Sequence, residues 1–300
     1  SSGSFFSNEC KIAELLMYPS DMTTEVVAIS NEQSLYYGLP DPAGDADAQA
    51  FIDAVDGAGG SLTSTEESAV TTLVTDLKDA GVWTKMQAIY PMVGGTATSQ
   101  KFNLANPLDT DAAFRLTFYG GWTHSATGAD PNGTNAYADT FFNPNSDLAS
   151  FTDSHYSVYS RDDEVSNTII IGAYDGTVDL TQIQPSNAST TFWDGRFSPA
   201  TGKIGAALSN TQSLIMMSRE SSTLLTGYHV ASAVGTATTT MATSMDEEMY
   251  LSARNSGGSP SLYSPREIAF ASLGSSMTGS EQSDFYDAVQ AFQTSLSRQV

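Results

Sequence analysis

From residue 83 onward the sequence alternates between apolar and polar residues, and this pattern restricts the fold more than any other feature. Phe114, Leu116 and Phe118 alternate with more polar residues, as in a strand with one buried face. Further strands are predicted at 137–142, 155–160, 168–174, 203–208, 213–217, 227–233, 236–242, 248–254 and 266–273. Turn pairs (Asn-Gly, Asp-Gly or Gly-Gly) stand at 132–133, 175–176, 194–195 and 257–258. The pattern predicts a mostly β protein, an antiparallel β-sandwich with a few peripheral helices.

Three helices are predicted from apolar residues at helical spacing. A short helix covers 46–55, and a second covers 64–80, with Ser64 and Glu67 as its capping box and Gly81 placed to end it. The third covers 282–298, with Thr278 and Glu281 as its capping box. Its apolar stripe consists of Phe285, Ala288, Val289, Phe292 and Leu296. Since an isolated helix of this length is marginal in water, we expect the stripe to dock on the sandwich.

The segment 1–40 is predicted to lie outside the sandwich. It contains a strand-like run, a turn with Met-Thr and a helix-like run, in the same order as residues 268–300. We interpret it as the closing strand and helix of a preceding domain or as an appendage, with chance similarity as the alternative. A linker rich in Pro and Gly and the first two helices form a lead-in at 41–82. The sandwich and its C-terminal helix cover 83–300.

Charge and composition exclude several classes of partner. The net charge is −22, from 12 Lys plus Arg against 34 Asp plus Glu, so nucleic acid is not an expected partner. The acidic residues are scattered, which favours a solvated surface in a salty extracellular medium, with a calcium site as the alternative. Cys10 is the single cysteine, so no intrachain disulfide is expected. No run of eighteen apolar residues occurs, and no membrane partner is expected.

Several runs between residues 83 and 142 resemble those of a known protein family. They are Trp83-Thr-Lys-Met-Gln-Ala-Ile-Tyr, Lys101-Phe-Asn-Leu, Ala113-Phe-Arg-Leu-Thr-Phe-Tyr-Gly-Gly-Trp and Pro131-Asn-Gly-Thr-Asn-Ala-Tyr. The stretch is similar to one in bacteriophage virion and tail-associated proteins, where it opens a concanavalin A-like (laminin G-like) jelly roll. Together with 266–300, the resemblance covers most of the chain after about residue 45. It implies a jelly-roll fold and a structural role on an extracellular virion, while the fold itself serves lectins, hydrolases and structural modules alike.

The sequence contains no recognisable catalytic motif. His124, His155 and His229 lie far apart, and no Gly-x-Ser-x-Gly elbow accompanies them. We expect His124 and His155 at strand ends or on the surface. The Glu-x-Asp-x-x-Glu strand that jelly-roll glucanases share is missing, and the acidic runs 162–164 and 246–248 are contiguous, which is typical of loops. A carboxylate pair assembled from distant strands remains the alternative, and we expect no enzyme activity.

A sugar-binding or calcium site is predicted in the segment 122–139. Trp122, His124, Asn132 and Asn135 supply the aromatic and planar polar groups that hold sugars, and Asp130 and Asp139 supply oxygens for calcium. In the alternative interpretation, Trp122 belongs to the core and Asn132 to a turn. No other cofactor is expected.

We therefore expect a non-enzymatic structural or adhesion module of a phage particle, on its tail, fibre or capsid surface. Other virion proteins and a host-surface glycan are the expected partners, and a homo-oligomer is the expected assembly. The alternative from another class is a carbohydrate-active enzyme or a secreted lectin of the same fold.

Overall fold

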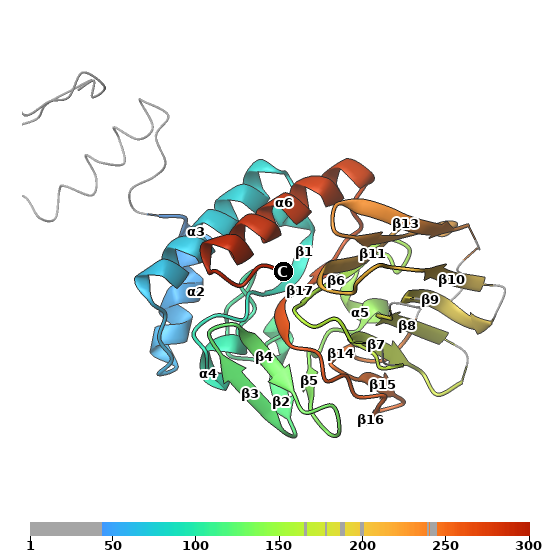
Figure 1. Ribbon diagram of the computed structural model, residues 1–300, viewed down its shortest axis with the longest axis horizontal. Coiled ribbons are helices and arrows are strands. Elements are labelled where there is room, and N and C mark those ends of the chain that lie inside the picture. Colours follow the sequence, from blue (N-terminus) through green and yellow to red (C-terminus); the bar gives the residue numbers. More distant parts are fainter. Residues whose placement is uncertain are drawn as a thin grey trace, which may run out of the picture. The chain divides into compact units, whose positions relative to one another are not determined.

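The computed structural model describes residues 44–300 except 165–166, 178, 187–189, 199–200, 239 and 241–244 (Figure 1). By its internal contacts the chain divides into two compact units, Ser1–Gly44 and Asp45–Val300. The second unit holds all the described helices and strands. The predictions for 1–40, for Cys10 and for the first residues of the lead-in lie outside the described residues.

Few helices and many strands make up the described chain. The α-helices are α2 (Ala46–Gly57), α3 (Ser64–Asp79), α4 (Ala97–Gln100), α5 (Pro144–Asp147) and α6 (Gly279–Ser295). Two short 3-10 helices are η1 (Trp83–Lys85) and η2 (Asp111–Ala113). Among the described residues, no helix has the length and apolar character needed to cross a membrane.

The strands form two sheets. Sheet A has the order β13 (Ser232–Ala237), β12 (Leu224–His229), β11 (Ser213–Ser221), β6 (Ser154–Ser160), β17 (Ile268–Gly274), β4 (Gly128–Pro131) and β3 (Trp122–Ser125), and β1 (Met86–Tyr90) also pairs with β17. Sheet B has the order β10 (Thr201–Ala206), β9 (Thr190–Ser198), β8 (Asp179–Gln184), β7 (Ile171–Tyr174), β14 (Tyr250–Leu251), β5 (Tyr137–Asp139) and β2 (Thr117–Tyr119). At its margin β15 (Arg254–Ser256) runs parallel to β7 and pairs with β16 (Ser259–Ser261). The other described pairs are antiparallel, which confirms the predicted β-sandwich.

Two hydrophobic cores lie on opposite faces of sheet A. One core fills the space between the sheets and includes Val158, Ile215 and Leu273. The other joins the outer face of sheet A to the helices and includes Tyr159 and Met216. Since successive side chains of a strand point to opposite faces, both faces of β6, β11 and β17 are buried. These strands therefore show continuous burial in place of the alternation typical of a half-exposed sheet.

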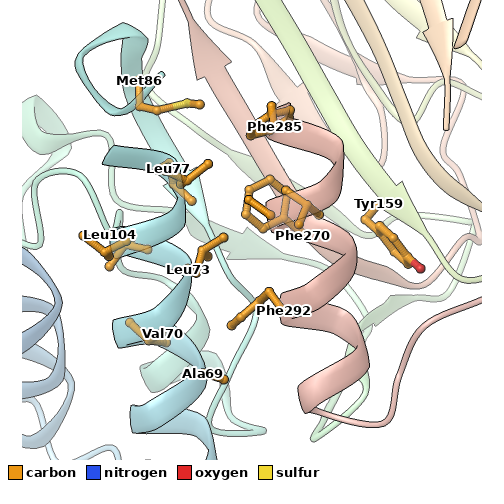
Figure 2. Packing of buried hydrophobic residues seen from close by; sticks show 14 of the residues in the cluster. Ala69, Val70, Leu73, Leu77, Met86, Leu104, Tyr159, Phe270, Phe285 and Phe292 are labelled. Atoms are coloured by element: carbon orange, nitrogen blue, oxygen red, sulfur yellow. The ribbon is translucent and has the colours of Figure 1, made fainter. Parts of the chain in front are cut away.

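The C-terminal helix docks on sheet A as predicted. Figure 2 shows Phe285 and Phe292 of α6 beside Phe270 of β17, opposite Leu73 and Leu77 of α3. Both phenylalanines of α6 are at least 97% buried, with exposed fractions of 0% and 3%. The helices α3 and α6 run side by side over this face (Figure 1). The helices of the lead-in therefore share a hydrophobic core with the sandwich.

The N-terminal capping boxes of α3 and α6 show where these two helices begin. The box of Thr278 and Glu281 at α6 is confirmed. At α3 the box lies one residue earlier than predicted, with Thr63 as N-cap and Glu66 as its partner. The prediction of Ser64 and Glu67 was wrong because both registers carry a hydroxyl followed by a glutamate, so the sequence pattern fits either.

Two further predictions need correction, and a third holds only in part. The strand at 114–119 is reduced to β2, because Phe114 adopts a left-handed conformation with φ of 59°. Asp194 and Gly195 lie in the middle of β9, paired with Thr181 and Leu180 of β8, and do not form a turn. His155, the second residue of β6, lies at a strand end as predicted, but it is fully buried and not at the surface.

Candidate functional site

Trp122 is held in the framework at the β2–β3 end of the sandwich. Its indole Nε1–H donates to the carbonyl oxygens of Tyr119 at 3.0 Å and of Tyr137 at 3.2 Å. Its ring meets Phe118 edge-on, with the ring centroids 5.2 Å apart, and packs against the core between the sheets. The indole therefore fastens the backbones of β2 and β5 to β3.

His124, two residues further along β3, is also part of the framework. Its Nδ1 lies 2.6 Å from Oε1 of Gln100. The amide nitrogen of Gln100 donates to the carbonyl oxygens of Met92, Ser125 and Gly128. Its Oε1 is therefore the acceptor in the contact with His124, and His124 Nδ1 is the donor. Burial lowers the pKa of His124, which favours the neutral ring. This histidine joins β3 to α4, of which Gln100 is the last residue.

Asn132 and Asn135 close the turn between β4 and β5. Oδ1 of Asn132 accepts from the backbone N–H groups of residues 134, 135 and 136, as in an Asx turn. Oδ1 of Asn135 accepts from Asn132 Nδ2 and from the N–H of Gly121, which follows β2. Nδ2 of Asn135, an exposed residue, has no partner among the described residues. The side-chain N–H groups of Asn135 are therefore available as hydrogen-bond donors where β2 ends and β5 begins.

Asp130 and Asp139 lie on different sheets. Asp130 is exposed on β4, paired with Thr123 of sheet A, whereas Asp139 is 7% exposed on β5 in sheet B. Burial raises the pKa of Asp130, and the charges of Asp162 and Glu267 raise it further. Within the described parts of the chain, no three His, Cys, Asp or Glu side chains are placed to hold a metal ion. A calcium role for these two residues stays a prediction.

A row of tyrosines crosses the face of sheet B that points away from sheet A. Tyr119 of β2 stacks on Tyr137 of β5 with centroids 4.8 Å apart and planes 14° apart. Tyr137 stacks in turn on Tyr250 of β14 at 4.8 Å and 29°. The alternate residues Ala138 and Leu251 face the core between the sheets, so the tyrosines point outward. We call Tyr119, Tyr137 and Tyr250 the tyrosine band.

One end of the tyrosine band is open to solvent. Tyr119 is 44% exposed, and β2 is the last described strand of sheet B, so no strand from the described residues continues this sheet beyond its ring. Burial raises the pKa of Tyr137 and of Tyr250, so these hydroxyls stay protonated and able to donate at neutral pH. Together with the free amide of Asn135, this end offers an apolar ring face beside hydrogen-bond donors.

A pair of carboxylates stands beside the other end of the band. Asp139 pairs across the strands with Thr117 and Tyr250, and its side chain is hydrogen-bonded to that of Glu248. Burial raises the pKa of Asp139 to about 6; the Phe141 amide opposes this rise and the charge of Glu248 adds to it. Burial also raises the pKa of Glu248. The two side chains therefore share a proton in weakly acidic solution.

This pair does not have the geometry of a glycosidase. The two carboxyl groups of retaining enzymes stand about 5–5.5 Å apart and those of inverting enzymes about 6.5–9.5 Å. Asp139 and Glu248 are in direct hydrogen-bond contact, which leaves no room between them for a glycosidic bond or a water molecule. The spacing of this pair therefore matches neither class of glycosidase.

A buried histidine and serine form the other pair with catalytic side chains. His155 Nε2 lies 2.9 Å from Ser272 Oγ, and its Nδ1 lies 2.6 Å from the carbonyl oxygen of Ser275. His155 is 0% exposed beneath α6 and contacts the ring of Phe285. Burial lowers the pKa of His155 to about 4. The pair has no access to a substrate and acts as a polar connection within the core.

The tyrosine band was not identified from the sequence. Tyr119, Tyr137 and Tyr250 lie on three strands far apart in the chain, and their stacking depends on strand order and register. The available signal was weak: Tyr119 and Tyr137 occupy the polar positions of alternating strands, where a large aromatic residue is unusual. Of the predicted residues, the structure brings Asn135 and Asp139 to the band, and Trp122 supports it through the backbone.

Comparisons with known proteins give structural similarity only. No protein-family model matches the chain, and no curated protein matches it. The binding domain of botulinum neurotoxin DC, solved with rat synaptotagmin II, has a TM-score of 0.49 at 8% identity, over 69% of this chain and 52% of that one. Domain 4 of the arabinanase AbnA from Geobacillus stearothermophilus, solved with arabinotriose, has a TM-score of 0.45 at 14% identity, over 67% of this chain and 98% of that one. A NanB sialidase mutant from Streptococcus pneumoniae has a TM-score of 0.40 at 13% identity. The match covers 55% of this chain and 27% of the sialidase chain.

Proposed function

We propose that this chain is a non-enzymatic adhesion module that binds a glycan at the open end of the tyrosine band, where Tyr119 is 44% exposed. The observation that carries the proposal is the open ring face of Tyr119 at the end of an ordered aromatic row. Exposed aromatic side chains cost little conformational entropy to order, and their faces suit the C–H surface of a sugar ring. The exposed amide of Asn135 flanks the open end of the row and suits a sugar hydroxyl.

Several observations support the absence of enzyme activity. The carboxylates beside the band touch each other, and the buried pair of His155 and Ser272 lies beneath a helix. A carbohydrate-active enzyme or a secreted lectin of the same fold is the competing function.

The phage context comes from the sequence resemblance described for residues 83–142. It supports a place on the outside of a virion, where the exposed ring of Tyr119 would meet the host surface. In this proposal the partners are other virion proteins and a host-surface glycan, and copies of the chain assemble as a homo-oligomer. Mass-spectrometric identification of this chain in purified particles would test the location.

A glycan array together with a reducing-sugar assay tests the binding function. The purified chain is expected to bind a subset of glycans and to release no sugar from host polysaccharide. Tyr119→Ala should weaken binding about fivefold, since one aromatic contact is worth about 1 kcal/mol. Leu108→Ala is the matched control, because Leu108 is 61% exposed and lies outside the band.

Two results would overturn this proposal. Unchanged binding by Tyr119→Ala, with an unchanged melting temperature, would place the site elsewhere. Reproducible sugar release by the wild-type chain, abolished by Glu248→Gln, would make the protein an enzyme.

A further inference from the structure

Arg254 lies on the same face of sheet B as the tyrosine band. In the sheet register Gly172 of β7 is the partner of both Tyr250 and Arg254. Paired residues point to the same side of a sheet, so Arg254 projects outward, as Tyr250 does. Its guanidinium carbon lies 5.1 Å from the ring centroid of Tyr174, which shares this face. The arginine therefore continues the aromatic row beyond β14.

The guanidinium of Arg254 is oriented but not neutralised. Its Nε donates to Ser256 Oγ at 3.0 Å, and the Ser256 hydroxyl contacts that of Ser261 at 2.8 Å. The side chain is half-buried, and burial lowers the pKa of Arg254. Stacking on Tyr174 and the hydrogen bond to Ser256 fix the plane of the guanidinium group. Its two terminal nitrogens have no partner among the described residues.

This arrangement is exceptional in so acidic a protein. The other described cations with access to solvent form ion pairs: Lys78, Lys85, Lys101, Arg115 and Arg161 each contact a carboxylate within 4.0 Å. Lys203 also has an interaction partner. Arg266 and Arg298 are 0% exposed and donate to backbone carbonyl oxygens. Arg254 has no carboxylate partner in the described part of the chain, although acidic residues outnumber basic ones by 34 to 12.

We propose that Arg254 is the anion-binding residue of the glycan site and recognises the carboxylate or sulfate group of an acidic sugar. This inference rests on the proposed glycan-binding function and names the class of ligand. A guanidinium offers two parallel N–H donors that match the two oxygens of such a group. Partial burial strengthens this contact, and the distant negative charges of the protein are screened beyond about 8 Å at physiological salt.

The neighbouring groups complete a small polar subsite. The hydroxyls of Ser256 and Ser261 lie beside the guanidinium and suit the ring hydroxyls of the same sugar. Lysine would not replace the arginine fully, because its ammonium group is a point charge that neither stacks on Tyr174 nor forms the paired bonds.

An array that carries neutral, uronate-bearing, sialylated and sulfated glycans tests the inference. The wild-type chain is expected to bind acidic glycans, and Arg254→Gln should weaken that binding about tenfold to hundredfold, as the loss of a charged hydrogen-bonded pair does. Arg254→Lys should retain part of it. Lys101→Gln is the matched control, since it removes the same charge from a cation that is already paired with Asp109. The uronate and sulfate spots show which anion is preferred.

The outcomes separate this inference from the proposed function. Binding confined to neutral glycans would overturn the role of Arg254 and leave the tyrosine band as a glycan site. Acidic-glycan binding that survives in Arg254→Gln would overturn it as well. A chain that binds no glycan of any class would overturn the proposed function and the inference together.

Discussion

Replacing Asp139 by asparagine is expected to stabilise this protein at neutral pH. The carboxyl is 7% exposed, contacts Glu248, and has a pKa of about 6 in the folded chain against 3.8 for an ordinary aspartate. The folded state thus binds a proton more tightly than the unfolded state between these two values. Stability therefore falls as pH rises through this window, and the loss is complete above about pH 7.

The size of this effect follows from the two pKa values. At about 1.4 kcal/mol per pKa unit, the difference between 3.8 and about 6 is worth about 3 kcal/mol. Asparagine keeps the oxygen that accepts from the N–H of Phe141 at 2.9 Å and adds a donor toward Glu248. Because Glu248 carries part of the coupling, we expect a gain of about 1–3 kcal/mol at pH 8.

Urea unfolding at pH 4, 6 and 8 measures the effect. The gain of Asp139→Asn should be present at pH 8 and vanish at pH 4, where the wild-type carboxyl is largely protonated. Asp56→Asn, a substitution at an exposed position of α2, is the control and should change stability by less than about 0.5 kcal/mol at each pH. A destabilised variant at pH 8, or a gain of equal size at pH 4, would refute the burial of a paired carboxyl at this position.

Three further predictions concern the core and the metal. Stability should fall as pH drops from 6.5 toward 4, by up to about 3 kcal/mol from His155, because its lowered folded pKa means that the unfolded state takes up the proton first; a His155→Gln variant with an unchanged pH dependence would contradict this. Phe285→Ala and Phe292→Ala should each cost about 3 kcal/mol or more in unfolding free energy, since both rings are buried against sheet A; unchanged melting curves would show that α6 does not pack there. Millimolar calcium should leave the melting temperature unchanged, and a rise that disappears in Asp130→Ala would establish a site.

The helices and most strands were predictable because their signals are local. The Thr278 cap and the apolar stripe of α6 lie within a few turns of sequence, and strand periodicity needs only neighbouring residues. Burial of His155 was missed because α6, which covers it, comes more than a hundred residues later. The tyrosine band could not be predicted for the same reason, because its residues are far apart in the sequence. The band joins β2, β5 and β14, and sequence spacing does not specify the order of strands in a sheet.

The role of Trp122 illustrates a different limit. The sequence allowed either a ligand platform or a core residue, and the structure places the ring half-buried with its N–H bound to two carbonyl oxygens. The hydrogen bonds of an indole depend on which backbone groups come within about 3 Å, which composition cannot reveal. By contrast, the turn at Asn132 was predictable, since Asn-Gly pairs close turns through local bonds.

The structure of the complete chain with the tightest-binding acidic oligosaccharide from the array tests the central claim most directly. A sugar ring is predicted against the open face of Tyr119 at the end of the tyrosine band, with the acidic group of the oligosaccharide within hydrogen-bond distance of Arg254. A sugar bound in the groove between α3 and α6, or at the turn of β3 and β4, would contradict it.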